Sequence, residues 1–242
     1  MRCRGALAAF AGIITDSPVK DTTMNDGLNR SFYRETVRDS RSADGKVVRQ
    51  RDGKGEYAHV QVTVRGLTRG HGTALAWNAG PNIPVKFAPS VLEGIHLAMN
   101  TGVLAGLELA DVHISVDDGS YHDVDSTKDA FREAADKAVT EAIRLARPII
   151  LEALSKVTAT VPEKFIDLVE ARMKSRGATT KTASSETAFQ ILAVTIPTLD
   201  VNNLIVEVLE NSEGGARIVV RSAGFGPRPE PPETVEQWVG RG

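Results

Sequence analysis

The chain has 242 residues, a formal net charge of −2 and 41% hydrophobic residues, values typical of a soluble globular protein with one large domain or two small ones. The small net charge excludes a global attraction to nucleic acid, so any such role must come from local basic clusters. The single cysteine, Cys3, excludes an intrachain disulfide and a thiolate metal cluster. This fits a reducing cytoplasm, where we expect the protein to act. No apolar run is long enough to span a bilayer.

Residues 1–29 are predicted to form a leader and linker. Two arginines precede an apolar stretch at residues 6–14, a pattern that fits either a short signal-peptide core or, as we favour, a short strand or leader. The following stretch up to residue 29 is polar and contains Pro18 and Gly27, which is typical of a linker.

Residues 30–148 are predicted to form a first α/β unit. Its first strand is expected at residues 32–37, followed by a polar turn at 40–45 and a basic, glycine-containing loop at 49–56. Residues 57–64 alternate between polar and apolar side chains, which predicts a half-buried strand. A further strand is expected at 74–77.

The second half of this unit is predicted to contain two helices around one strand. The first helix opens at Pro89 and Ser90 and closes at Gly102, and residues 112–116 alternate as a strand. A long helix then ends before Pro148. Asp125 or Ser126 is expected to cap it, and its stripe of alanines is expected to let it lie close to a sheet.

Residues 149–223 are predicted to form a second unit. Strands are expected at 155–161, near 180, at 188–196 and at 216–222, with helices at 162–175 and 199–209. This order is β-α-β-β-α-β, the split βαβ arrangement. The tail, residues 224–242, is rich in proline and is expected to be extended or disordered.

A run between the strand at 112–116 and the long helix reads Gly-Ser-Tyr-His-Asp-Val-Asp-Ser at positions 119–126. A cation could bind His122, Asp123 and Asp125, with Asp117 or Asp118. We disfavour this metal site because the run itself contains no H-x-x-x-H, E-x-x-H or EF-hand spacing.

The same run does not favour a nucleophilic enzyme. Ser120, His122 and Asp123 are adjacent in sequence, whereas catalytic triads are assembled from separated segments, and no G-x-S-x-G motif is present. The sequence also lacks G-x-x-x-x-G-K-[ST], so these residues contain no P-loop for GTP or ATP.

Contact with RNA is the third interpretation of this run together with the basic loop. Arg49, Arg51 and Lys54 would donate to phosphates, and Gly53 and Gly55 would allow close backbone approach. His122 would add a planar group, and Tyr57 and Tyr121 are candidate supports. The residues alone also fit two ordinary solvated loops.

Several motifs, in this order and spacing, resemble the fourth domain of translation elongation factor G. They are Phe-Tyr-Arg-Glu-Thr at 32–36, Gly-Lys-Gly-Glu-Tyr-Ala-His-Val at 53–60, Val-Leu-Ala-Gly at 103–106, the run at 119–126, and Pro-Ile-Ile-Leu-Glu at 148–152. The resemblance extends over residues 31–222. It implies an α+β protein made of two-layer α/β sandwiches, in which a ribosomal protein S5 domain 2-like unit is followed by a ferredoxin-like unit.

The resemblance also implies partners and contact residues. In that family, the far end of the fourth domain enters the decoding region of the small ribosomal subunit and contacts transfer RNA, messenger RNA and ribosomal RNA. The implied RNA-contact residues are Arg49, Arg51, Gly53, Lys54, Gly55, Tyr121, His122 and Asp123, with His122 matching the family's tip histidine.

The chain departs from the family pattern in ways that affect its expected activity. The GTPase domain and the two domains after it do not occur in these residues, so we expect a non-enzymatic protein without cofactor or metal. A GTPase-domain protein acting in trans is an additional expected partner. The second unit matches the fifth domain less well. A diverged paralogue serving as a protein-interaction module, or a piece of a split gene, remains an alternative.

Overall fold

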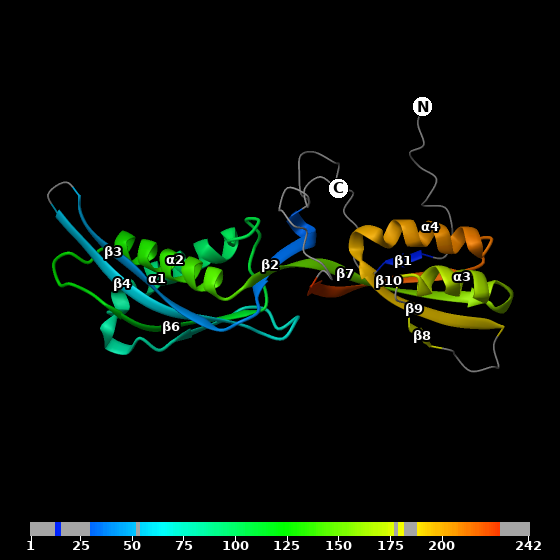
Figure 1. Ribbon diagram of the computed structural model, residues 1–242, viewed down its shortest axis with the longest axis horizontal. Helices are drawn as coiled ribbons and strands as arrows, with labels where there is room; N and C mark the ends of the chain where they lie inside the picture. Colours follow the sequence, from blue (N-terminus) through cyan, green and yellow to red (C-terminus); the bar gives the residue numbers. More distant parts are fainter. Residues whose placement is uncertain (1–12, 16–29, 52–53, 177–178, 182–187, 228–242) are drawn as a thin grey trace, which may run out of the picture. The chain divides into compact units, whose positions relative to one another are not determined.

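The computed structural model describes residues 13–15, 30–51, 54–176, 179–181 and 188–227. These residues divide into two compact units, one made of 30–151 with 225–227 and the other of 13–15 with 152–224. Each unit packs two helices against a β-sheet (Figure 1). The predicted α+β fold class, an S5 domain 2-like unit followed by a ferredoxin-like unit, is confirmed.

The first unit is built on a four-stranded sheet with the order β3-β4-β6-β5. The β3/β4 and β4/β6 pairs are antiparallel, and β5 runs parallel to β6. Helix α1 connects β5 to β6, and α2 follows β6. The elements are β2 (Tyr33–Val37), β3 (Arg41–Arg51), β4 (Lys54–Gly66), β5 (Ala74–Trp77), α1 (Ala88–Thr101), β6 (Val112–Ser120) and α2 (Lys128–Leu145).

The core of the first unit lies between this sheet and the two helices. As predicted, β4 alternates, and its inward-facing residues Ala58, Val60, Val62 and Val64 are fully buried. Helix α2 contributes mainly small side chains to this core, and they allow a very close approach to β3. A Cβ atom added at Gly45 would overlap the backbone carbonyl oxygen of Ala134. No side chain other than hydrogen therefore fits at position 45 without moving the helix.

The polar turn expected at residues 40–45 is wrong, because Arg41–Arg51 form the continuous strand β3. Ser42 and Asp44 are polar because they lie on the solvent-facing side of the sheet, and Gly45 is required by the contact with α2 rather than by a turn. Most of the loop expected at residues 49–56 is likewise strand, with only residues 52–53 between β3 and β4 outside the described residues.

The predicted cap of the long helix is also wrong. Helix α2 begins at Lys128, and its N-cap is Thr127, whose side-chain oxygen accepts a hydrogen bond from the backbone N–H of Ala130 at 3.1 Å. Asp125 and Ser126 lie before the cap and have other partners, described below. The helix ends at Leu145, and Pro148 begins the next strand, β7.

The second unit has the predicted βαββαβ order. Its elements are β7 (Pro148–Pro162), α3 (Ile166–Lys174), β8 (Thr179–Lys181), β9 (Phe189–Pro197), α4 (Val201–Asn211) and β10 (Arg217–Pro227). The strand order β10-β7-β9-β8 is that of a ferredoxin-like sheet, and β7 and β9 pair antiparallel. Arg176, just after α3, forms two hydrogen bonds of 2.8 Å with the carboxylate of Glu207 on α4.

Two segments expected to lie outside the folded units contribute strands. Residues Ile13–Thr15 form β1, which pairs parallel to β10 through Ile13 and Ile218 and the two positions that follow. Strand β10 extends to Pro227, so the first residues of the expected tail are extended within a strand. The rest of the expected leader and tail, residues 1–12, 16–29 and 228–242, lies outside the described residues.

A buried carboxylate organises the part of the first unit that precedes β6. Glu35 on β2 is fully buried, and its two oxygens accept four backbone N–H groups, from Val103, Leu104, Ala105 and Leu107, at 2.6–3.1 Å. The glycines on each side of this segment have positive φ, 53° at Gly102 and 69° at Gly106. A Cβ atom at Gly102 would lie 2.6 Å from the carboxylate. Glycine is therefore required at position 102, before the Val-Leu-Ala-Gly segment, because a side chain there would collide with the Glu35 carboxylate.

Replacement of Glu35 by glutamine tests this arrangement. The amide would point an N–H donor at backbone N–H groups that need acceptors, so we expect the free energy of unfolding to fall by about 3 kcal/mol. Urea denaturation followed by circular dichroism measures this. The matched control is Glu108→Gln, which removes an exposed carboxylate that, among the described residues, pairs with Arg34 alone and should change stability by less than about 0.5 kcal/mol. Equal effects of the two substitutions would contradict the role given to Glu35.

Candidate functional site

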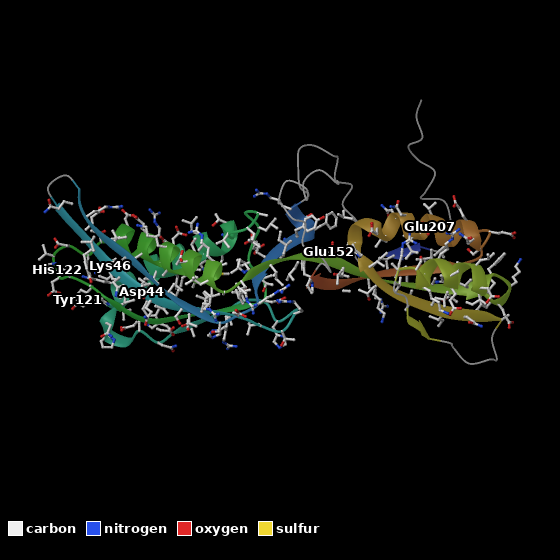
Figure 2. The ribbon with its side chains drawn as sticks, in the orientation of Figure 1. Asp44, Lys46, Tyr121, His122, Glu152 and Glu207 are labelled. Atoms are coloured by element: carbon white, nitrogen blue, oxygen red, sulfur yellow. The ribbon has the colours of Figure 1, made fainter. Side chains whose placement is uncertain are left out.

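Two segments meet at one end of the first unit, which we call the tip: residues 49–56 at the β3–β4 hairpin and residues 120–126 between β6 and α2. They share this end because β4 lies between β3 and β6 and is antiparallel to both. Arg51 and Lys54 are the last register pair of the hairpin. Their side chains and residues 52–53, which include Gly53, lie outside what the structure describes. Figure 2 shows Tyr121 and His122 at this end.

The second tip segment is fastened to β4 by hydrogen bonds around Tyr57. The backbone N–H of Tyr57 donates to the carbonyl of Asp125 at 2.9 Å, and the Ser126 hydroxyl donates to the carbonyl of Tyr57 at 2.8 Å. The Tyr57 and Ser120 hydroxyls are hydrogen bonded at 2.7 Å. Residues 120–126 are therefore fastened to the backbone and side chain of Tyr57 on β4, and α2 begins directly after them. We call this supported segment the platform.

His122 lies on this platform with its side chain 57% exposed. Its Nδ1 atom is 3.1 Å from an Asp125 carboxylate oxygen and 3.3 Å from the Asp125 backbone nitrogen. One nitrogen cannot donate to the first and accept from the second at once. We favour the shorter contact, in which Nδ1–H donates to the carboxylate, because hydrogen bonds to a charged acceptor are the stronger kind. The opposite ring nitrogen, Nε2, is then left for an external partner.

Gly55 lies where the two tip segments touch. A Cβ atom at this position would lie 2.5 Å from the Asp125 side-chain carboxyl carbon and one of its oxygens. We predicted that Gly55 lets the backbone approach an external partner. The structure shows that a contact inside the protein also requires glycine at this position. The absence of a side chain at position 55 lets the Asp125 carboxylate reach His122.

Arg49 is the one predicted phosphate donor whose side chain the structure describes. Its guanidinium contacts Glu56 on β4 at 2.6 Å and Glu133 on α2 at 2.8 Å. The hydrogen bond with Glu56, together with the charges of Glu133 and Glu56, raises the pKa of Arg49 above its ordinary value. Since its charge is shared between two carboxylates, Arg49 ties the hairpin to α2.

Two carboxylates of the disfavoured metal site, those of Asp117 and Asp118, have partners on the sheet and the segment before α1. The Asp118 carboxylate accepts hydrogen bonds from Asn82 and the Gly119 backbone, and these hold its pKa below the ordinary value. Burial alone would raise the pKa of Asp117, but hydrogen bonds from Thr63, Ser115 and Asn78 lower it. Across the described residues, no group of three or more histidine, cysteine or acidic side chains could hold a metal ion.

The outer rim of the tip consists of exposed side chains from residues 121–124. Tyr121 is 41% exposed and Val124 is 83% exposed, while His122 and Asp123 are also exposed. Sequence reasoning missed Val124, and it missed Ser126 as the residue that fastens the loop to β4. An apolar residue in the middle of a polar run was the available signal for Val124. No local pattern indicated the Ser126 contact, because its partner is 69 positions away.

Comparison with known proteins relates this part of the chain to a protein family. Residues 32–147 match the family model described as elongation factor G, domain IV. Over these residues the chain is similar to domain IV of elongation factor G. The match spans β2 through α2 and includes every predicted contact residue of the tip. The resemblance to the C-terminal part of elongation factor G, on which the expected fold was based, is thereby confirmed.

A solved structure agrees over a larger part of the chain. A crystal structure of a protein from Thermus thermophilus is similar with a TM-score of 0.72 and 26% sequence identity, over 81% of this chain. The similarity therefore extends beyond domain IV into the ferredoxin-like unit. The chain spans only 30% of the length of that protein. Among the described residues, no helix is both long enough and apolar enough to cross a membrane.

The contact between Gly55 and Asp125 predicts a coupled pair of substitutions. In Gly55→Ala, the new methyl group would displace the Asp125 carboxylate from His122, and we expect a loss of about 1–2 kcal/mol of stability, as is usual for overpacking. Asp125→Ala removes the atoms that collide, so the double variant should recover most of this loss. Urea denaturation of the four proteins in a double-mutant cycle measures the coupling. Additive effects of the two substitutions would show that the segments do not touch at this point.

Proposed function

We propose that this protein binds the ribosome, or another structured RNA, through the tip of its domain IV, and that it acts by contact rather than by catalysis. The observation that supports this most is the platform at residues 120–126. Hydrogen bonds to β4 and the start of α2 hold a histidine and a tyrosine at the end of a domain IV. Planar side chains on rigid supports suit unpaired bases and shaped RNA surfaces.

The tip residues are assigned different contributions. Arg51 and Lys54 supply phosphate contacts from the end of the hairpin, where Gly53 allows close backbone approach. Gly55 makes room for the Asp125 carboxylate beside His122. Tyr121 and His122 supply planar contacts, and Asp123 borders them. Arg49 contributes mainly by positioning the hairpin, because it is already paired with Glu56 and Glu133.

The family resemblance suggests where this binding takes place. The proposed site is the decoding region of the small ribosomal subunit, with ribosomal RNA, transfer RNA and messenger RNA as neighbours, in the cytoplasm. Any GTP hydrolysis that accompanies binding would come from a GTPase domain outside these 242 residues, such as a protein acting in trans. The ferredoxin-like unit, which we propose corresponds to domain V, would hold the tip at its site.

Ribosome co-sedimentation tests the proposal. We expect the full chain to pellet with ribosomes, and His122→Ala/Lys54→Ala to bind at least about fivefold more weakly, since one planar contact and one phosphate contact are lost. Raising the salt concentration should weaken wild-type binding, and the Lys54 substitution alone should reduce the slope of that dependence by about one.

The matched control removes the same two side-chain types away from the tip. His71 lies in the connection between β4 and β5, at the opposite end of β4, and Lys156 lies on β7 of the other unit. His71→Ala/Lys156→Ala should pellet as the wild type does. Unchanged pelleting of the tip variant would refute tip binding. A wild-type chain that captures proteins but no ribosomes would instead favour the interaction-module alternative.

A further inference from the structure

The sheet of the second unit has one covered face and one open face. On the covered face, alternate strand residues such as Val157, Leu192 and Ile218 form a core with α3 and α4. The residues between them point to the opposite side of the sheet. Both described helices of this unit contribute to the core side, so within the unit the opposite side has no helix over it.

We call this side the open face, and it consists of the outward-pointing residues of β7 from 154 to 162, of β9 from 189 to 197 and of β10 from 217 to 223. It carries threonine hydroxyls, apolar side chains and three basic side chains, those of Lys156, Arg217 and Arg221. Among these described residues none is acidic, although the chain as a whole has a net charge of −2. The open face is therefore locally positive.

Phe189 and Arg217 lie at the same end of the open face. Phe189 is the register partner of Pro162 on the neighbouring strand β7. A Cβ atom at Gly215, two positions before Arg217, would lie 3.3 Å from the Cγ atom of Pro162. The start of β9 and the start of β10 therefore lie on either side of Pro162. Since neighbouring strands are about 4.8 Å apart, these two strands are separated by roughly 10 Å across β7.

The largest apolar side chains of this end are exposed. Phe189 is 47% exposed and Ile191, the next outward-pointing residue of β9, is 40% exposed, whereas Leu192 on the covered face is 2% exposed. An aromatic ring near guanidinium and hydroxyl groups on one flat surface is the combination that binds single-stranded nucleic acid, because rings stack on bases while cations contact phosphates.

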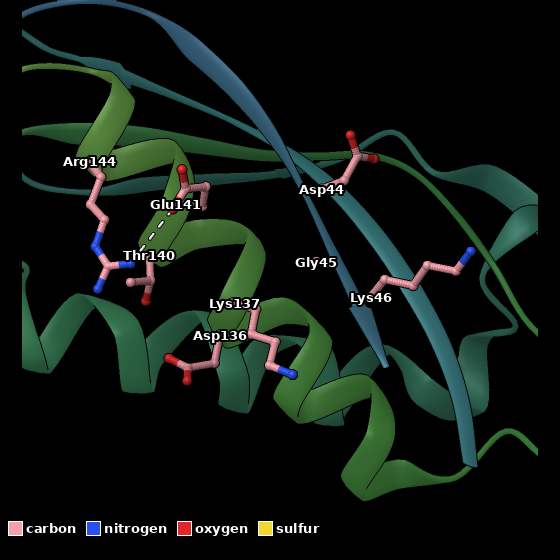
Figure 3. Close-up of a pocket in the computed structure, with 8 residues that line it drawn as sticks. All are labelled: Asp44, Gly45, Lys46, Asp136, Lys137, Thr140, Glu141 and Arg144. Carbon is pink, nitrogen blue, oxygen red and sulfur yellow. Dashed lines mark ion pairs between the residues drawn. The ribbon is translucent and has the colours of Figure 1, made fainter. Parts of the chain in front are cut away.

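A polar hollow in the first unit provides a comparison. It lies between β3 and α2, and Figure 3 shows that α2 lines it with the carboxylates of Asp136 and Glu141 as well as the cations of Lys137 and Arg144. A polyanion would meet carboxylates in this hollow. On the open face it would meet cations alone, so of these two surfaces the open face is the one that suits a polyanion.

We propose that the open face binds single-stranded RNA, with the RNA strand crossing the sheet from β10 to β9. Arg217 and Arg221 contact phosphates, Phe189 stacks on a base, and the Thr160 hydroxyl on β7 donates a hydrogen bond between them. A four-stranded βαββαβ sheet with an aromatic ring on its open face is the arrangement by which RNA-recognition domains bind single strands.

The proposed path of the RNA excludes the far end of the face. Lys156 is the register partner of Thr195, six positions along β9 from Phe189, which places it about 20 Å away. The open face is also a site separate from the tip, because it belongs to the other compact unit. The proposal therefore does not depend on RNA binding by the tip.

Fluorescence anisotropy with a labelled oligouridine of about 12 nucleotides tests the proposal on the full chain, since such a probe has the length of typical single-strand sites. Phe189→Ala should weaken binding at least about fivefold, because one stacked base is lost. Phe189→Tyr keeps the ring and should bind as the wild type does. Arg217→Gln should reduce the slope of the salt dependence by about 0.7, the value for one phosphate contact on a single strand.

The matched control, Leu168→Ala/Arg172→Gln, removes an exposed apolar and an exposed basic side chain from α3, in the helix layer of the same unit. It should bind the probe as the wild type does, and circular dichroism melting checks that each variant is folded. A wild-type chain that does not bind the probe would overturn the proposal.

Two further outcomes would assign the RNA or the face differently. Loss of probe binding in His122→Ala/Lys54→Ala, with none in Phe189→Ala, would place the RNA at the tip and overturn the open-face site. Displacement of the probe by polyglutamate as readily as by unlabelled oligouridine, together with unchanged binding by Phe189→Ala, would also overturn it and would indicate a surface for acidic protein segments.

Discussion

The close contact between α2 and β3 is the constraint on which the rest of the first unit depends. At Gly45 the helix backbone is so near the strand that no side chain fits, and the alanines of α2 make the approach possible along the helix. This distance determines where the N-terminus of α2 lies relative to β4. The segment 120–126 therefore has a short distance to cover between β6 and α2, and hydrogen bonds to Tyr57 hold it in place. A larger residue at position 45 would therefore disturb the tip without touching it.

Two further interactions fix the tip relative to α2 and β4. Arg49 joins the hairpin to α2 through Glu56 and Glu133, and Gly55 admits the Asp125 carboxylate that orients His122. At the other end of the unit, the Glu35 carboxylate gathers four backbone N–H groups and fixes the segment that leads into β6. In each of these interactions a guanidinium or a carboxylate contacts several partners and thereby fixes the position of the backbone around it.

Much of the fold could be predicted from sequence, and the failures have a common cause. The alternation in β4, the alanine stripe of α2 and the βαββαβ order depend on local periodicity, which the sequence displays directly. The turn expected at residues 40–45, the cap expected at Asp125 or Ser126 and the open loop expected at 49–56 all involve polar residues or glycines. Such residues suit turns, caps and edge strands equally well. Whether each of them lies in a turn, a cap or a strand here depends on contacts with α2, Tyr57 and Glu133, which are distant in sequence. Local patterns could therefore not predict it.

The structure also changes which basic residues of the first unit are candidates for external contact. The sequence alone suggested that the basic residues at 49–54 form one phosphate-binding group, but Arg49 is committed to carboxylates within the protein. The phosphate contacts proposed for the tip therefore depend on Arg51 and Lys54, the last register pair of the hairpin, and not on Arg49.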